Sequence, residues 1–167
     1  MIKQIIHESL PYYSPLPSDD EVMNAQANLD LVRRISVEFV GGFDSKDICP
    51  SLNSVSLKTI IGKIIQNAYD SIYISGKSAG VEIIMEAKKE NEFIKINIFD
   101  NGIGFEDLES DISMLRSTFA NRQVPFGGRG TALSSVVEEL APIGGSISRA
   151  NRQGLAGAII TILIPER

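Results

Sequence analysis

The sequence predicts an α+β fold, a two-layer sandwich in which helices cover one face of a mixed, mostly antiparallel β-sheet. Two pairs of strand-like segments are each joined by a short turn, which favours antiparallel pairing. Helical patterns stand before and between these hairpins, and such helices usually gather on one face of the sheet. With 167 residues, 43% of them hydrophobic and 22% charged, the chain is expected to form one well-packed domain.

Residues 1–54 are predicted to form an arm followed by a helix. Three prolines before Ser18 prevent a continuous helix at the start. Ser18 and Glu21 have the spacing of a capping box, which predicts a helix from about residue 19 to the mid-30s, ended by Gly41-Gly42. The residues that recur there at helical spacing are Val22, Ala25, Leu29, Val32 and Ser36.

A long amphipathic helix and a hairpin are expected next, after a loop-like stretch at 43–54. The helix has one apolar stripe, formed by Leu57, Ile60, Ile61, Ile64, Ala68 and Ile72. Gly76, just beyond it, is typical of a helix end. Residues 81–87 and 93–99 predict two strands joined by a turn at 88–91, because the second alternates isoleucine with polar residues.

The rest of the chain predicts a lid, a helix and a closing hairpin. Residues of about 105–128 are irregular, with a brief helical hint near 108–115, and loops that long in a compact domain are usually functional. Residues 131–140 have a helical pattern. Strands are expected over 146–150 and 158–164.

Charge and composition exclude several classes of protein. Sixteen Lys and Arg against 21 Asp and Glu leave a net charge of −5, which argues against binding of nucleic acid through bulk charge. No apolar run approaches the roughly 20 residues of a transmembrane helix, and no secretory signal is visible. The single cysteine, Cys49, excludes an internal disulfide and indicates a cytoplasmic location.

Common catalytic constellations are also absent. A Ser/His/Asp triad would need His7, which lies in the predicted arm. No phosphate-binding GxxxxGK[ST] loop occurs, and Gly128-Arg129-Gly130 lacks the preceding strand and third glycine of a dinucleotide site. One cysteine and one histidine are too few ligands for structural zinc.

Three short segments remain as candidates. In the first, Asn67 lies on the flank of the apolar stripe, one helical turn beyond Lys63, so both side chains can reach the same edge of a site. An amide oxygen there can complete the shell of a Mg²⁺ ion held otherwise by phosphates and water. The alternative is an ordinary asparagine on a helix surface.

The second segment is Asp100-Asn101-Gly102-Ile103-Gly104, at the end of an apolar strand. A carboxylate there can accept a charge-assisted hydrogen bond from an exocyclic amine such as that of adenine. Its glycines allow a flat base to approach the backbone, although the same residues also suit an ordinary turn. The third segment, 126–133, places glycines before a helix N-terminus, which favours a polyphosphate or simply a flexible loop.

Together, the order and spacing of the three segments resemble the Bergerat ATP-binding fold of the GHKL superfamily. This superfamily includes gyrase, the ninety-kilodalton heat-shock chaperone, mismatch-repair ATPases and the catalytic domains of sensor histidine kinases. The resemblance covers about residues 55–165, and segments 144–147 and 157–165 look like the closing hairpin of the histidine-kinase branch. Residues 128–134 are similar both to the kinase glycine box and to the Arg-Gly-x-Ala-Leu motif of mismatch-repair ATPases.

The resemblance implies that residues 55–167 bind ATP and Mg²⁺, with 105–128 as the lid. Asn67 would coordinate the metal, Asp100 would accept from the adenine amine, and the glycines beside Asp100 would line the base. The full set of expected nucleotide contacts is Asn67, Asp70, Asp100, Gly102, Gly104, Gly128, Arg129, Gly130, Thr131, Ala132 and Leu133. Residues 1–54 are interpreted as an arm and helix, or as the remnant of a dimerisation element.

Three positions depart from the family pattern and argue against efficient hydrolysis. Lys63 stands where hydrolysing relatives carry a glutamate that activates water, and a protonated lysine cannot act as that base. It is interpreted instead as a phosphate contact. Ala158 replaces a threonine that helps to hold the base in relatives, and Ala132 replaces a glycine of the kinase branch.

Three functions are compatible with these features. The first is a kinase-type domain in a two-component signal-transduction system, which transfers the γ-phosphoryl group of ATP to a histidine, or as second choice a serine, of a partner protein. Its partner would be a phosphoacceptor or response regulator, and a homodimer is compatible with the chain. The second is a degenerate, nucleotide-gated protein-binding module, and the third is an ATPase switch. His7-Glu8 faintly resembles a phosphoacceptor box, but the nearby prolines disfavour the helix that such a histidine needs.

Overall fold

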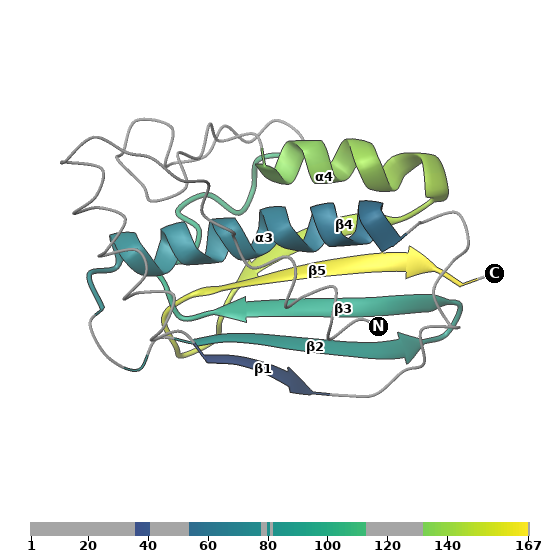
Figure 1. The fold of residues 1–167 in the computed structure, drawn as a ribbon. Coiled ribbons are helices and arrows are strands. Elements are labelled where there is room, and N and C mark those ends of the chain that lie inside the picture. The colour runs from purple at the N-terminus through teal and green to yellow at the C-terminus, as the bar shows by residue number, and fades with distance from the viewer. Residues whose placement is uncertain (1–35, 41–53, 78–79, 81, 113–131, 167) are drawn as a thin grey trace, which may run out of the picture.

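The computed structural model describes residues 36–40, 54–77, 80, 82–112 and 132–166 (Figure 1). These residues form strands, two α-helices and a short 3₁₀-helix. In chain order the elements are β1 (Ser36–Val40), α3 (Ser54–Ile74), β2 (Glu82–Glu90), β3 (Phe93–Asp100), α4 (Ala132–Leu140), η3 (Ala141–Ile143), β4 (Ser146–Asn151) and β5 (Ala158–Pro165). No helix among these residues is long and apolar enough to cross a bilayer.

The strands form a single sheet in the order β1-β2-β3-β5-β4. Strands β2, β3, β5 and β4 pair antiparallel in that order, whereas β1 pairs parallel with β2. Figure 1 shows α3 and α4 lying over the same face of this sheet. The predicted two-layer α+β sandwich with a mixed, mostly antiparallel sheet is therefore confirmed.

Strand β1 corrects the interpretation of the N-terminal part of the chain. The helical spacing predicts that Ser36 belongs to the helix. In the structure Ser36 begins a strand that pairs with β2, with Val37 opposite Ile83. Pairing with an existing strand edge decides the conformation of so short a segment, and periodicity within the segment cannot reveal that pairing. The remainder of the predicted helix lies outside the described residues.

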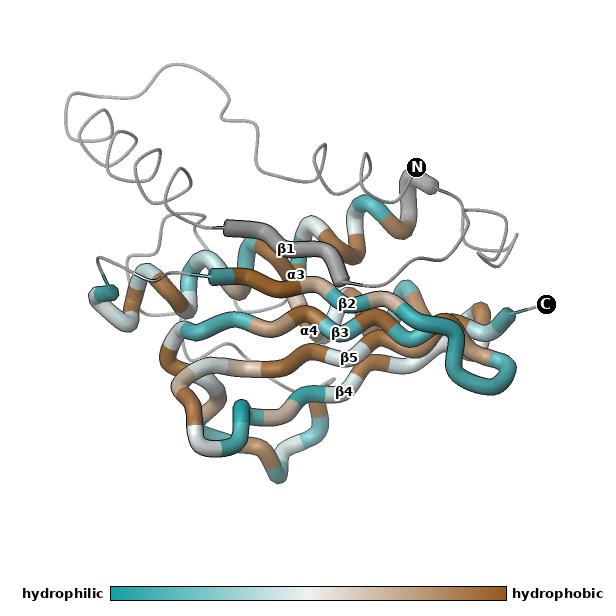
Figure 2. The backbone as a smooth tube through the Cα atoms, turned by 90° about the horizontal axis from the view of Figure 1, so that it is seen from below, coloured by the Kyte–Doolittle hydropathy of each residue, from teal (hydrophilic) through white to brown (hydrophobic). Residues whose placement is uncertain are grey.

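The hairpin between β2 and β3 is tighter than expected. Residues 88–90 continue β2 and pair with β3, so the predicted four-residue turn shrinks to Asn91 and Glu92. Asn91 takes a positive φ of 57°, which asparagine tolerates better than most residues. Figure 2 shows this hydrophilic turn at the end of the two strands, and Asp100 lies at the opposite end of β3.

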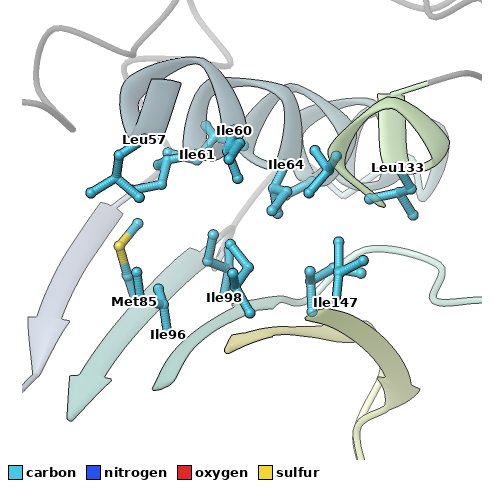
Figure 3. Close-up of a cluster of buried hydrophobic side chains, with 14 of the residues drawn as sticks. Leu57, Ile60, Ile61, Ile64, Met85, Ile96, Ile98, Leu133 and Ile147 are labelled. Atoms are coloured by element: carbon cyan, nitrogen blue, oxygen red, sulfur yellow. The ribbon is translucent and has the colours of Figure 1, made fainter. Parts of the chain in front are cut away.

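The core lies between the sheet and the two helices. Side chains of α3 and α4, including Ile60, Ile64 and Leu133, point toward strand residues such as Ile98 and Ile147 (Figure 3). Burial of each such side chain contributes about 1.5–3 kcal/mol. Helix α3 is buried on more than the predicted stripe, because Ile65 and Tyr69 are each at most 1% exposed. This packing fixes the positions of α3 and of the strands, including the end of β3 at Asp100.

Candidate functional site

Asp100 is the buried acidic group at the end of β3, with 3% of its surface exposed. Its Oδ1 atom accepts hydrogen bonds from the amide of Gly102 at 2.8 Å, the hydroxyl of Ser71 at 3.3 Å and the amide of Ala158 at 3.4 Å. Its Oδ2 atom accepts no hydrogen bond from the residues that the structure describes. The carboxylate is thus oriented through one oxygen, and the other has unused acceptor capacity.

The environment of Asp100 disfavours its charge. Burial raises the pKa of Asp100, although the three hydrogen bonds and the positive charge of Arg152 act in the opposite direction. A donor that bonds to Oδ2 would favour the charged form. The site therefore suits a ligand that brings an N–H group to this oxygen.

Residues 101–105, which include Gly102 and Gly104, form a turn directly after Asp100. This glycine turn is enclosed by α3 and β4. A side chain at Gly102 would bring its Cβ to 2.5 Å from the carbonyl carbon of Ser71 in α3. Gly104 has a φ of +77°, and a Cβ there would lie 2.8 Å from the Oδ1 atom of Asn151 in β4. Glycine is therefore required at both positions, for space at the first and also for conformation at the second.

Ser71 and Gly157 are neighbours of Asp100 in the candidate site that the sequence prediction missed. The Ser71 hydroxyl donates to Asp100 and accepts from the amide of Ile103 at 3.1 Å, so it joins α3 to the glycine turn. Ser71 stands four residues after Asn67, and this helical spacing was the available signal. A Cβ at Gly157 would lie 2.7 Å from the Cα of Asn101, a contact that only the fold creates.

The two polar residues on α3 have different surroundings. Asn67 is partly buried and makes no side-chain hydrogen bond within the described ranges. Lys63 donates to the hydroxyl of Ser135 at 2.9 Å and forms an ion pair with Glu139, both on α4. The structure therefore places the Lys63 ammonium against α4, while the Asn67 amide keeps its bonding capacity.

Some of the remaining predicted site residues lie within the described ranges and others lie outside them. Asp70 is buried on α3, next to Ser71 in sequence. Ala132 and Leu133 begin α4, where the side chain of Leu133 packs in the core, so only the backbone there is suited to a ligand. Gly128, Arg129, Gly130 and Thr131, together with lid residues 113–128, lie outside the described residues.

The donor set fits a metal ion that takes most of its ligands from elsewhere. The described part of the chain contains no group of three or more histidine, cysteine, aspartate or glutamate side chains placed to hold a metal. A single amide oxygen, that of Asn67, is compatible with Mg²⁺, which keeps several waters and binds substrate phosphates.

Comparison with known proteins identifies a family. A family model described as "Histidine kinase-, DNA gyrase B-, and HSP90-like ATPase" matches residues 52–167. No curated protein matches the sequence.

Solved structures share the fold at low sequence identity. A mycobacterial sensor histidine kinase, MprB, superposes with a TM-score of 0.61 at 18% identity, covering 99% of this chain and 95% of that one. The histidine kinase ThkA in complex with the response regulator protein TrrA gives 0.63 at 16% identity, with 99% and 40% covered. Full-length ShkA in complex with AMPPNP gives 0.56 at 18% identity, with 97% and 34% covered.

Proposed function

Because the chain belongs to the family of histidine kinase-, DNA gyrase B- and HSP90-like ATPases, we propose that it binds Mg·ATP and transfers the γ-phosphoryl group to a histidine of a partner protein. A serine acceptor is the second choice. The observation that carries the proposal is the geometry of Asp100, whose Oδ1 is held by three donors while Oδ2 has no donor among the described residues. The fold shared with MprB and ThkA supports the kinase branch.

Asp100 is proposed to select adenine. The exocyclic amine of adenine would donate to Oδ2, and a hydrogen bond to a charged acceptor is stronger than a neutral one. Guanine carries a carbonyl oxygen at the equivalent ring position. This oxygen cannot donate a hydrogen bond, so it would face the carboxylate unfavourably. The adjacent Gly102 and Gly104 allow the turn after Asp100 to pack closely against Ser71 and Asn151.

Asn67 is proposed to orient the phosphates through Mg²⁺. When bound, the ion neutralises phosphate charge, and the Asn67 amide oxygen would supply one of its ligands. The main-chain amides at the start of α4 favour the negative charge of a polyphosphate. In the transfer, the bond between the γ-phosphorus and the bridging oxygen breaks, a phosphorus–nitrogen bond to the acceptor imidazole forms, and ADP leaves.

The surroundings of Lys63 support transfer over hydrolysis. Its ammonium is paired with Glu139 and hydrogen-bonded to Ser135, and a protonated amine cannot remove a proton from water. An acceptor imidazole is itself the nucleophile, so phosphoryl transfer needs no such base in this chain. The same feature favours the second candidate, a nucleotide-gated binding module without turnover.

The proposed partner is a phosphoacceptor or a response regulator. The structure of ThkA with TrrA shows that the shared fold occurs in a protein bound to such a regulator. A cytoplasmic location and a homodimer belong to the same proposal, as does the division into residues 1–54 and an ATP-binding domain at 55–167.

Incubation with γ-labelled Mg·ATP and purified candidate acceptor proteins tests this function. We expect acid-labile, base-stable label on the acceptor, as phosphohistidine requires, and little release of free phosphate. Nucleotide-dependent capture of the acceptor without label would support the binding module instead. Steady phosphate release without an acceptor would contradict both.

A further inference from the structure

Edge strand β4 holds the glycine turn through Asn151. The side-chain amide of Asn151 accepts from the backbone N–H of Phe105 at 2.7 Å and donates to the carbonyl of the same residue at 2.8 Å. This pair of bonds reproduces the exchange between two opposed residues of an antiparallel ladder. One side chain therefore satisfies both polar backbone groups of the residue that ends the turn.

Arg149 holds the following segment from the same face of β4. Residues two apart on a strand share a face, so Arg149 and Asn151 project together. The Arg149 guanidinium donates from Nη2 to the carbonyl of Ser110 at 2.9 Å and lies 5.4 Å from the centre of the Phe105 ring. Its Nε and Nη1 atoms are buried and have no hydrogen-bond partner among the described residues. The contact with the Phe105 ring therefore replaces part of the hydration of the guanidinium.

Residues 106–110 have a compact local structure that suits this anchoring. The Asp107 carboxylate accepts from the amides of Glu109 at 2.9 Å and Ser110 at 3.1 Å, which closes a tight turn. The Ser110 carbonyl that Arg149 contacts is therefore part of an ordered unit. Two side chains of β4 thus hold Phe105, the last residue of the glycine turn, and Ser110, five residues beyond it.

The glycine turn is consequently fixed from both sides. Ser71 of α3 contacts the amide of Ile103 near its start, and Asn151 of β4 contacts Phe105 at its end. We propose that Asn151 and Arg149 are positioning residues for nucleotide binding, which hold the glycine turn in place beside the Asp100 carboxylate, whose Oδ1 accepts from the amide of Gly102. This inference rests on the proposed function, and it adds a requirement for strand β4 that lies outside the three nucleotide motifs.

The test compares Asn151→Ala with a matched variant, Asn97→Ala, in the full chain. Asn97 also takes part in a side-chain hydrogen bond within the sheet, which it accepts from the Thr161 hydroxyl at 2.8 Å. Its neighbours Ile96 and Ile98 pack in the core, so the alternation of β3 puts the Asn97 side chain on the other face of the sheet. Binding of Mg·ATP is measured by calorimetry, and amide hydrogen exchange is followed at Phe105 and along β5. Arg149→Met, which keeps an apolar stem without the guanidinium, is measured in the same way.

We expect Asn151→Ala to weaken Mg·ATP binding on the order of tenfold, because a smaller fraction of molecules would hold the turn ready for the base. Exchange at Phe105 should accelerate while β5 stays protected. Arg149→Met should weaken binding by a smaller factor, and Asn97→Ala should not change it. The melting temperature should fall no more in Asn151→Ala than in Asn97→Ala, because Asn151 is exposed.

Unchanged affinity in Asn151→Ala, or equal losses in both asparagine variants, would overturn the positioning role. Failure of the wild-type protein to bind Mg·ATP would overturn the proposed function, and with it the effect on affinity. Exchange at Phe105 distinguishes the two cases: normal protection in Asn151→Ala would show that Asn151 does not hold the turn, whatever the ligand.

Discussion

At the scale of single residues, Asp100 combines an acceptor oxygen that has no donor among the described residues with a cost to the folded state. Burial raises the pKa of Asp100, so the folded chain binds its proton more tightly than the unfolded chain does. Between the two pKa values the unfolded state binds fewer protons, and the contribution of Asp100 to stability therefore falls as pH rises. A charged group kept in such surroundings is typical of a site at which function, and not stability, decides the residue.

Asp100→Asn is expected to increase the free energy of unfolding of the nucleotide-free protein at neutral pH. The gain should shrink as pH falls through the raised pKa of Asp100 toward the ordinary aspartate value of about 3.9, because the wild-type carboxyl of the folded protein becomes neutral in this range. Urea unfolding over this pH range measures both effects. Asp107→Asn is the control of opposite sign, because hydrogen bonds from Ser110 lower the pKa of Asp107. A loss of stability in Asp100→Asn that is equal at all pH values would contradict the expectation.

The sequence could predict those residues of the candidate site whose pattern is visible in consecutive positions of the chain. Asp100, Gly102 and Gly104 are recognisable because a carboxylate and two glycines directly follow an apolar strand. Ser71 had a weaker signal in its helical spacing from Asn67. Asn151 could not be foreseen, since its role depends on the pairing of β4 with β5, which brings it beside a segment far away in the sequence.

At the scale of elements, the ion pair between Lys63 and Glu139 joins the two helices of the upper layer. The Lys63 and Glu139 side chains are 28% and 31% exposed, so solvent screens their attraction in part. The hydroxyl of Ser135 adds a second contact between Lys63 and α4. This link fixes α4, whose first turn carries the proposed phosphate-binding amides, against the helix that carries Asn67.

Exchange of the two charges tests this link. Lys63→Glu and Glu139→Lys should each lower the free energy of unfolding, because each places like charges together, and the double variant should recover most of the loss. The expected coupling energy is about 0.2–1 kcal/mol, as for other partly exposed pairs. A double-mutant cycle by urea unfolding measures it, and strictly additive losses would show that the helices are not coupled through this pair.

Elements were predictable where one side of a segment faces the core. The long apolar pattern of α3 and the alternation in β3 specify their structure, and both are observed with nearly the predicted bounds. Strand β1 was missed because its five residues acquire their conformation from the edge of β2. The end of β2 was placed too early, since its lysines pair with β3 although they are exposed to solvent.

At the scale of the whole molecule, the sheet brings the proposed site to one end of the domain. Asp100 ends β3, Ala158 begins β5 and Asn151 ends β4, so the antiparallel order places all three at the same end. Ser71 lies in the last turns of α3, above that end. The apolar core fixes the positions of these helix and strand ends. The glycine turn and the residues up to Ser110 are held between α3 and β4.

Calorimetric titration of ATP, with and without Mg²⁺, tests most directly whether these residues form one adenine-nucleotide site. We predict that the wild-type protein binds Mg·ATP and discriminates against Mg·GTP. Asp100→Asn should lose affinity on the order of tenfold or more, because an amide N–H would face the adenine amine. Asn67→Ala should weaken binding only when Mg²⁺ is present. Equal affinity for ATP and GTP, together with unchanged binding in both variants, would contradict the assignment of this end of the sheet as the nucleotide site.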